Sequence, residues 1–138
     1  MNIGILLRTP FQNLVDHIHN SLAEHGYAEI RPAHGIVFQF IGKQGARLTE
    51  LAAQARMTKQ SMSYLLEYLE RADYVVRIAD ETDKRATIFR LTEKGWEVVA
   101  IAEEAIAQFE RRCKKNLGAG NYRMLVGLLE KLNQDLGA

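Results

Sequence analysis

The stretch from Arg47 to Gly95 constrains the fold of this 138-residue chain more than any other segment. It predicts two short helices joined by a tight turn, two strands separated by a charged loop, and the start of another helix. The expected helices span residues 50–56 and 58–72, the strands residues 74–79 and 87–91, and the loop residues 80–85. A helix-turn-helix followed by a two-stranded ribbon is typical of a winged helix, which presents one helix and one loop to DNA.

Two threonines are expected to cap the short helices. Thr49 and Thr58 each precede a predicted helix start, and a threonine hydroxyl can accept a hydrogen bond from a free amide of the first turn. The second helix carries apolar residues at the spacing i, i+3, i+4 and i+7, at Met62, Leu65, Leu66 and Leu69. This spacing predicts one buried stripe and leaves the other face of the helix polar.

The N-terminal third predicts two more helices. Thr9 can cap and Pro10 suits the first helical position, so a helix is expected to start there, with residues 2–8 as a preceding turn bent by Pro10. Another helix is expected from Pro32 to about residue 41. Residues 46–48 are expected to form a very short third strand of the ribbon.

The last third predicts two long helices, the first capped by Thr92, with a break at residues 117–120. Each carries an apolar seam at steps of three and four residues: Val99, Ala102, Ile106, Phe109 and Cys113 in one, and Tyr122, Leu125, Leu129, Leu132 and Leu136 in the other. With the N-terminal helix, these seams exceed what a small winged helix needs to cover its core. The surplus predicts a homodimer; the alternative is a monomeric helical bundle beside the winged helix.

The expected fold is therefore mainly α with a small β-ribbon. We expect one compact domain with three parts: an N-terminal dimerisation helix (1–30), a winged-helix lobe (31–92) and C-terminal dimerisation helices (93–138). A formal net charge of +1 argues against a protein that coats nucleic acid nonspecifically. The single cysteine, the absence of a signal-peptide pattern and the absence of a long apolar stretch predict a cytoplasmic protein with no membrane contact.

Five short motifs occur in a fixed order. They are Leu48-Thr49-x-Leu51-Ala52, Thr58-Lys59-x-Ser61, Leu69-Glu70-x-x-x-Tyr74-Val75-x-Arg77, Asp80-x-x-Asp83-Lys84-Arg85 and Leu91-Thr92-x-x-Gly95. In this order and spacing they resemble the MarR family of bacterial transcriptional regulators. The resemblance implies a winged-helix homodimer that binds pseudo-palindromic double-stranded DNA, acts as a repressor rather than an enzyme, and responds to a small aromatic or anionic effector.

The chain departs from the family pattern in the second helix of the helix-turn-helix. Tyr64 and Tyr68 stand where the family often has arginine, and Asp73 stands where a glycine often ends that helix. Asp tolerates the left-handed backbone better than most residues, so the fold is expected to survive. The set of DNA contacts is expected to differ.

Ten residues are expected to make or shape the DNA contact: Thr58, Lys59, Gln60, Ser61, Ser63, Tyr64, Arg77, Asp83, Lys84 and Arg85. Those from the second helix lie in its first two turns, where the free amides can hold a phosphate while side chains reach base edges. Gln60 could read an adenine edge and Tyr64 could contact a thymine methyl or a phosphate.

The loop at residues 80–85 contains three acidic and two basic residues, so it would not attract phosphates as a block. It can bind DNA only through individually aimed side chains. The resemblance implies that Asp83 pairs with Arg85 and that Arg85 enters the minor groove, whose concentrated negative potential favours a guanidinium. Lys84 is expected to contact a phosphate and Arg77 to brace the loop or touch the DNA backbone. An ordinary solvated hairpin tip is the alternative.

Other chemistry has weaker support. His17, His34 and Phe38 could line an effector pocket, although a histidine bonded to the backbone is the alternative reading. Cys113 lies in a basic run that would favour thiolate, but also at a seam position that indicates a packed thiol. We expect no metal and no cofactor, since no spacing suits zinc, and no catalytic motif is present. Two rival functions remain open: a winged-helix protein-interaction module without DNA readout, and a small ligand-binding or catalytic protein.

Overall fold

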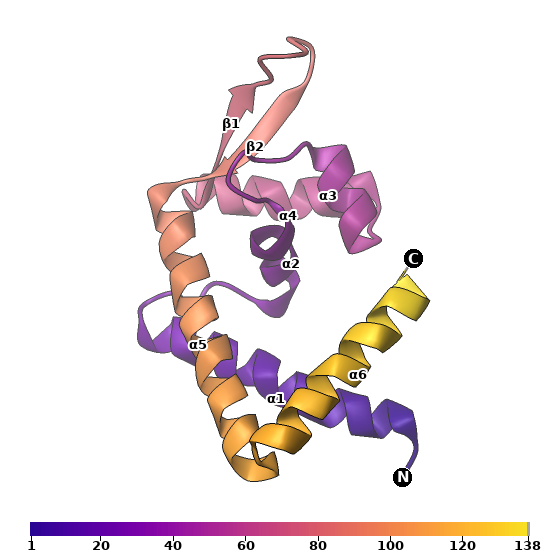
Figure 1. Ribbon diagram of the computed structural model, residues 1–138. Helices are drawn as coiled ribbons and strands as arrows, with labels where there is room; N and C mark the ends of the chain where they lie inside the picture. The colour runs from indigo at the N-terminus through magenta and orange to yellow at the C-terminus, as the bar shows by residue number, and fades with distance from the viewer. Residues whose placement is uncertain (138) are drawn as a thin grey trace.

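The computed structural model describes residues 1–137 and has the predicted order of elements (Figure 1). They are α1 (Ile3–Glu24), α2 (Pro32–Phe40), α3 (Leu48–Ala55), α4 (Lys59–Arg71), β1 (Val75–Ala79), β2 (Thr87–Leu91), α5 (Glu93–Leu117) and α6 (Ala119–Gly137). The ribbon projects from one end of the molecule, whereas α1 and the corner between α5 and α6 lie at the other end. The expected winged helix within a helical frame is confirmed.

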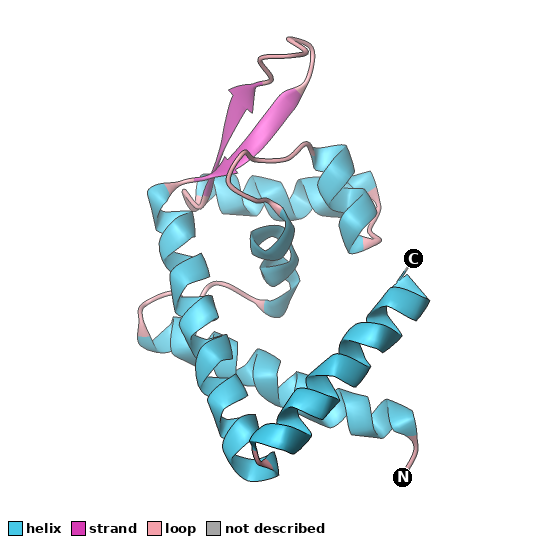
Figure 2. Cartoon of the chain, in the orientation of Figure 1, coloured by secondary structure: helices cyan, strands magenta, loops and turns pink. Residues whose placement is uncertain are grey.

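The winged-helix lobe is built on one apolar core. The helices α2, α3 and α4 and the inner face of the ribbon supply most of its fully buried side chains, which include Val37, Leu51, Met62, Leu66, Leu69 and Val75. Leu22 of α1 and Val98 of α5 belong to the same core. The strands pair antiparallel, with Val75 opposite Leu91 and Ala79 opposite Thr87 (Figure 2). In place of the expected short third strand, Ala46 forms a single β-bridge with Phe89.

The predicted start of α1 is wrong. The helix begins at Ile3, where the side chain of Asn2 accepts a hydrogen bond from the amide of Ile5 at 3.1 Å, and it runs through Pro10 without ending. A proline inside a helix removes one amide donor but need not stop the helix when both flanks are helical. The end was predicted correctly, since Gly26 follows the last turn with a φ of +93°.

The predicted cap of α3 is also wrong. The helix starts at Leu48, two residues earlier than expected, and Arg47 is its N-cap residue. The carboxylate of Glu50 accepts a hydrogen bond from the amide of Arg47 at 2.9 Å. The side chain that caps the start of this helix is therefore Glu50 and not Thr49. Thr49 is exposed in the first turn.

The long helices form the frame beneath the lobe. The α1 and α5 helices pack side by side, and α6 packs against the end of α5 after a break at Gly118. Among its described residues, α6 has none that is buried. Cys113 is partly buried on α5. Within residues 1–137, no helix combines the length and apolar character that crossing a bilayer would require.

Candidate nucleic-acid interface

The first turn of α4 forms an open hydrogen-bonding surface. Thr58 caps the helix as predicted, because its Oγ1 accepts a hydrogen bond from the amide of Ser61 at 3.0 Å. The same hydroxyl donates to Oγ of Ser61 at 2.9 Å. These bonds hold the turn in place, so its remaining donors are preorganised for an anionic group such as a phosphate.

The solvent-facing side of α4 is polar, as the sequence indicated. Lys59, Gln60 and Ser61 are exposed and Ser63 is partly buried. Tyr64 is 77% exposed, which is unusual for a tyrosine on a packed helix. A large ring held in solvent at this position is available to contact a base or a phosphate.

The wing is the loop from Asp80 to Ala86, between β1 and β2. Its first residue is hydrogen-bonded to the start of α3. Nε and Nη2 of Arg47 donate to Oδ2 of Asp80, the Nε bond at 3.1 Å, while Oδ1 accepts from the amide and hydroxyl of Thr82 at 3.0 and 2.8 Å. The hydrogen bond from Arg47, and next those from Thr82, lower the pKa of Asp80 to about 2. The carboxylate is therefore charged at neutral pH and is compensated by Arg47, so the wing carries less free negative charge than its sequence suggests.

Asp83 contacts Arg85 through the backbone amide of that residue. Oδ1 of Asp83 accepts from the backbone amide of Arg85 at 3.1 Å, which closes an Asx-type turn. The guanidinium of Arg85 and the ammonium of Lys84 belong to exposed residues at the wing tip. Asp83 thus orders the backbone beneath Arg85 and leaves its guanidinium available for DNA.

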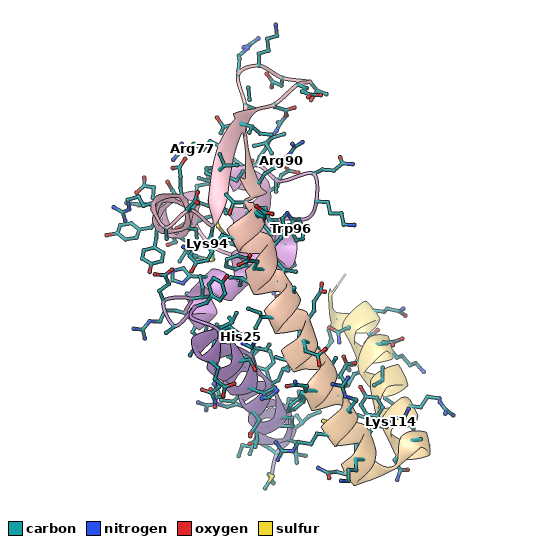
Figure 3. All side chains as sticks on the ribbon, turned by 90° about the vertical axis from the view of Figure 1, so that its left-hand side faces the viewer. His25, Arg77, Arg90, Lys94, Trp96 and Lys114 are labelled. Carbon is teal, nitrogen blue, oxygen red and sulfur yellow. The ribbon has the colours of Figure 1, made fainter. Side chains whose placement is uncertain are left out.

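Arg77 braces the ribbon. Its Nε donates to both carboxylate oxygens of Glu70 on α4 at 3.0 Å, and its guanidinium carbon lies 5.1 Å from the centre of the Phe89 ring. Arg90, on the neighbouring strand, donates to the carbonyl of Gln44 at 3.4 Å. Figure 3 shows both arginines on the ribbon, above Lys94 and Trp96 at the start of α5. Arg77 is therefore engaged within the lobe and supports the position of the wing.

The residues expected to line an effector pocket are engaged separately. His17 is 2.9 Å from Oε1 of Gln108 on α5. Nδ1 of His34 accepts from the amide of Arg31 at 2.9 Å, and its ring stacks on Tyr68 with centres 4.8 Å apart. Phe38 contacts the ring of Tyr74 edge to face at 6.0 Å. Burial first, and then the charges of His19 and Arg31, lower the pKa of His34, so its ring is neutral at neutral pH.

Tyr74 is the centre of a polar junction that the sequence did not reveal. Its ring is fully buried, and its hydroxyl donates to Oε1 of Glu29 in the connection between α1 and α2. Burial, followed by the bond to Glu29, raises its pKa. Nζ of Lys94 lies 4.2 Å from the centre of the same ring, and Tyr27 donates a second hydroxyl hydrogen bond to Glu97. These partners are separated by up to 70 residues, so no local pattern could indicate them.

Comparison with known proteins decides the family. Residues 28–86, which include the helix-turn-helix, β1 and the wing loop, match the family model described as the MarR family. The chain belongs to the MarR family.

A relative and two solved structures illustrate the similarity within the MarR family. The exopolysaccharide II synthesis transcriptional activator ExpG of Rhizobium meliloti is 34% identical over 65% of this chain and 46% of its own length. The crystal structure of MarR superposes with a TM-score of 0.77 at 18% identity, over 98% of this chain and 97% of that one. The transcriptional repressor CouR, bound to a 23-mer DNA duplex, gives 0.73 at 24% identity, over 95% and 92%.

The sequence match and the structural matches cover different shares of the proteins compared. The chain matches less than half the length of ExpG, so the activity of that whole protein does not transfer by alignment. The two solved structures establish the MarR fold for nearly the whole chain. Within that fold, this MarR-family chain places Tyr64 in solvent on α4, while Tyr68 is stacked on His34 and only partly exposed.

Proposed function

We propose that this chain is a sequence-specific DNA-binding transcriptional regulator that acts as a homodimeric repressor on pseudo-palindromic sites. The observation that carries the proposal is the capped, exposed first turn of α4, with Lys59, Gln60, Ser61 and Tyr64 free to bond a duplex. The CouR structure, which has the same fold, is a complex with duplex DNA and supports this assignment.

The wing supplies the second contact of the proposed complex. Arg47 fixes its base through Asp80, and Asp83 orders the backbone at Arg85. The guanidinium of Arg85 would bind the minor groove beside the major-groove site of α4, and Lys84 would bind a phosphate.

The homodimer is supported by apolar surface that one chain leaves uncovered. Several large apolar side chains are exposed on α1 and α6: Ile3, Leu6, Phe11, Met124, Leu125, Leu128, Leu132 and Leu136. A monomer usually exposes such residues singly, whereas here they recur along two helices from both ends of the chain. A twofold axis through these helices would present two α4 helices to successive major grooves about one helical turn of DNA apart.

Regulation by a small aromatic or anionic effector completes the proposal, on the strength of the family alone. An effector would release DNA by binding more tightly to an arrangement of the two lobes that does not match the operator. Titration of candidate aromatic acids into the protein–operator complex, followed by fluorescence anisotropy, tests this part of the proposal separately.

Selection of bound sites from a random pool of duplexes tests DNA recognition. We expect enriched sequences with twofold symmetry, and loss of affinity when Gln60 is replaced by alanine; Glu103→Ala on α5 serves as a matched surface control. A pool that yields no enriched site would contradict DNA readout and favour the protein-interaction module instead.

A further inference from the structure

We propose that Tyr27, Glu29 and Lys94 are positioning residues that determine which half-site spacing the dimer accepts. They would do so by fixing the angle between the winged-helix lobe and the long helices of the frame. This inference rests on the proposed function, since spacing has meaning only for a dimer that binds two half-sites.

The lobe joins the frame through two chain connections, residues 25–31 after α1 and Thr92 before α5. Both connections meet at the turn between α4 and β1. On the α5 side, the amide of Thr92 donates to the carbonyl of Tyr74 at 3.0 Å, and its hydroxyl donates to the carbonyl of Asp73 at 2.6 Å. The start of α5 is thereby fixed to this turn by one backbone and one side-chain hydrogen bond of Thr92.

Lys94 adds a side-chain attachment from the first turn of α5. Its Nζ donates to the carbonyl of Ala72 at 2.8 Å and lies over the face of the Tyr74 ring. The same Nζ is 3.8 Å from Oε1 of Glu29, the carboxylate that accepts the hydroxyl hydrogen of Tyr74. Lys94 therefore contacts the lobe and the α1–α2 connection at once.

Tyr27 closes the arrangement. Its hydroxyl donates to Glu97, one turn beyond Lys94, so it links the α1–α2 connection to the body of α5. Its ring meets that of Tyr74 edge to face, with centres 6.1 Å apart. A lobe held only by two connections could rotate about the line between them, whereas these cross-links oppose that rotation.

The lobe and the frame share one apolar core, which includes Leu22, Tyr74 and Val98, and the polar groups of Glu29 and Lys94 lie at its edge. Glu29 is half-exposed and Lys94 is partly exposed, whereas the lobe core formed by residues such as Leu51 and Leu66 is fully buried. Removing one cross-link should therefore loosen the angle while the lobe stays folded. The hydrogen bonds of Thr92 remain in such variants.

The angle between lobe and frame can be tested through the affinity of the dimer for operators with different half-site spacing. Adding one base pair between the half-sites increases their separation by about 3.4 Å and rotates one relative to the other by about 35° around the DNA axis. A dimer with a fixed angle should lose about tenfold in affinity, comparable to the effect of a mismatched base pair. A dimer with a loosened angle should follow the displaced half-site and lose about threefold or less.

The experiment compares Lys94→Met, Glu29→Gln and Tyr27→Phe with wild type on the selected operator and on versions with one base pair added or removed. Each substitution preserves the size of the side chain, and Glu29→Gln retains an acceptor for Tyr74. Glu103→Gln removes a charge from the exposed part of α5 and should keep the wild-type ratio. A wild-type spacing ratio in all three junction variants would overturn the inference.

A distance measurement separates this inference from the proposed function. Spin labels at Ala53→Cys on α3 and Ala100→Cys on α5, in a Cys113→Ser background diluted with unlabelled chain, report the lobe angle without DNA. We expect a narrow distance distribution that broadens in Lys94→Met and Tyr27→Phe but not in Glu103→Gln. If wild type selects no DNA, the proposed function and the spacing role fail together; unchanged distributions in folded variants reject the junction alone.

Discussion

Arg47 and Asp80 lie 33 residues apart in the sequence and form a two-nitrogen ion pair that joins the N-cap of α3 to the base of the wing. Arg47 thereby connects the helix-turn-helix to the ribbon. The other carboxylate oxygen of Asp80 accepts hydrogen bonds from the amide and the hydroxyl of Thr82. The wing is thus attached to the lobe at its base while its tip stays exposed, which is the arrangement a groove contact requires.

Asp80 should make the stability of the wing depend on acid pH. Its pKa is lowered to about 2 in the folded protein, against about 3.9 for an unperturbed aspartate. Because the folded pKa is the lower one, the stabilisation is complete above about pH 4 and is lost as pH falls through 2. Carboxyl NMR titration should show a midpoint near 2 in wild type and a higher midpoint in Arg47→Met; an unchanged midpoint would exclude the ion pair as its cause.

Arg85 should provide a large share of the wing's DNA affinity. Arg85→Ala should weaken operator binding by about 1–3 kcal/mol if the guanidinium occupies the minor groove. Asp83→Ala should weaken binding by less, because it only frees the backbone beneath Arg85. Anisotropy titration at fixed salt measures both, with Glu81→Ala in the same loop as the control. Equal affinities of Arg85→Ala and wild type would remove Arg85 from the interface.

The sequence predicted the elements whose signals are local. The apolar spacing of Met62, Leu66 and Leu69 and the cap at Thr58 indicated α4, and both agree with the structure. The start of α3 was misplaced because the threonine at position 49 was preferred as the cap, whereas the local hydrogen bond from the Arg47 amide to Glu50 marks the helix start. Arg47 gave no signal at all, since its role depends on a partner brought close only by folding.

The same limit applies to the junction around Tyr74. A buried tyrosine could be expected from the strand pattern, but its bond to Glu29 and the position of Lys94 over its ring could not. Contacts between distant segments leave no period or spacing in the sequence. The candidate DNA contacts on α4 were accessible to sequence reasoning because they follow from one helix and its cap, whereas the residues that position them were not.

His34 should make stability fall as pH drops below about 6.5. Its Nδ1 accepts from the amide of Arg31, which only a neutral imidazole can do, and its pKa is lowered chiefly by burial. His19 and Arg31 add positive charge nearby, which the carboxylate of Glu29 partly offsets. Because the folded pKa is below the unfolded value of about 6.5, protons favour the unfolded state on acidification.

The variant His34→Gln isolates this effect. Glutamine at the third helical position can still accept from the N-cap amide but does not titrate. Urea unfolding between pH 7.5 and 5.5 should show wild type losing stability relative to the variant as pH falls, while the other three histidines contribute equally to both. Parallel pH profiles would contradict a neutral, capping His34.

Gly95 should be intolerant of any side chain. A Cβ at this position would lie 2.4 Å from the carbonyl oxygen of Tyr74, so the start of α5 would have to move away from the α4–β1 turn. Overpacking of this kind costs about 1–3 kcal/mol. Urea unfolding of Gly95→Ala should show that loss, whereas Gly127→Ala on α6, where a Cβ meets open space, should show none or a small gain in helix stability.

The exposed apolar face of α6 that contains Leu128 and Leu132 should hold the dimer together. Leu128 is 59% exposed and Leu132 is 37% exposed in one chain, and the two residues lie one turn apart on the same face of the helix. Leu128→Glu places a charge where the partner helix should pack, and burying an unpaired charge is strongly unfavourable. Sedimentation velocity should then detect monomers at micromolar concentration. Gln134→Glu adds the same charge outside the leucine row and should leave the dimer intact. A wild-type protein that sediments as a monomer would contradict the proposed assembly, because a single chain presents only one α4 helix and one wing to the operator.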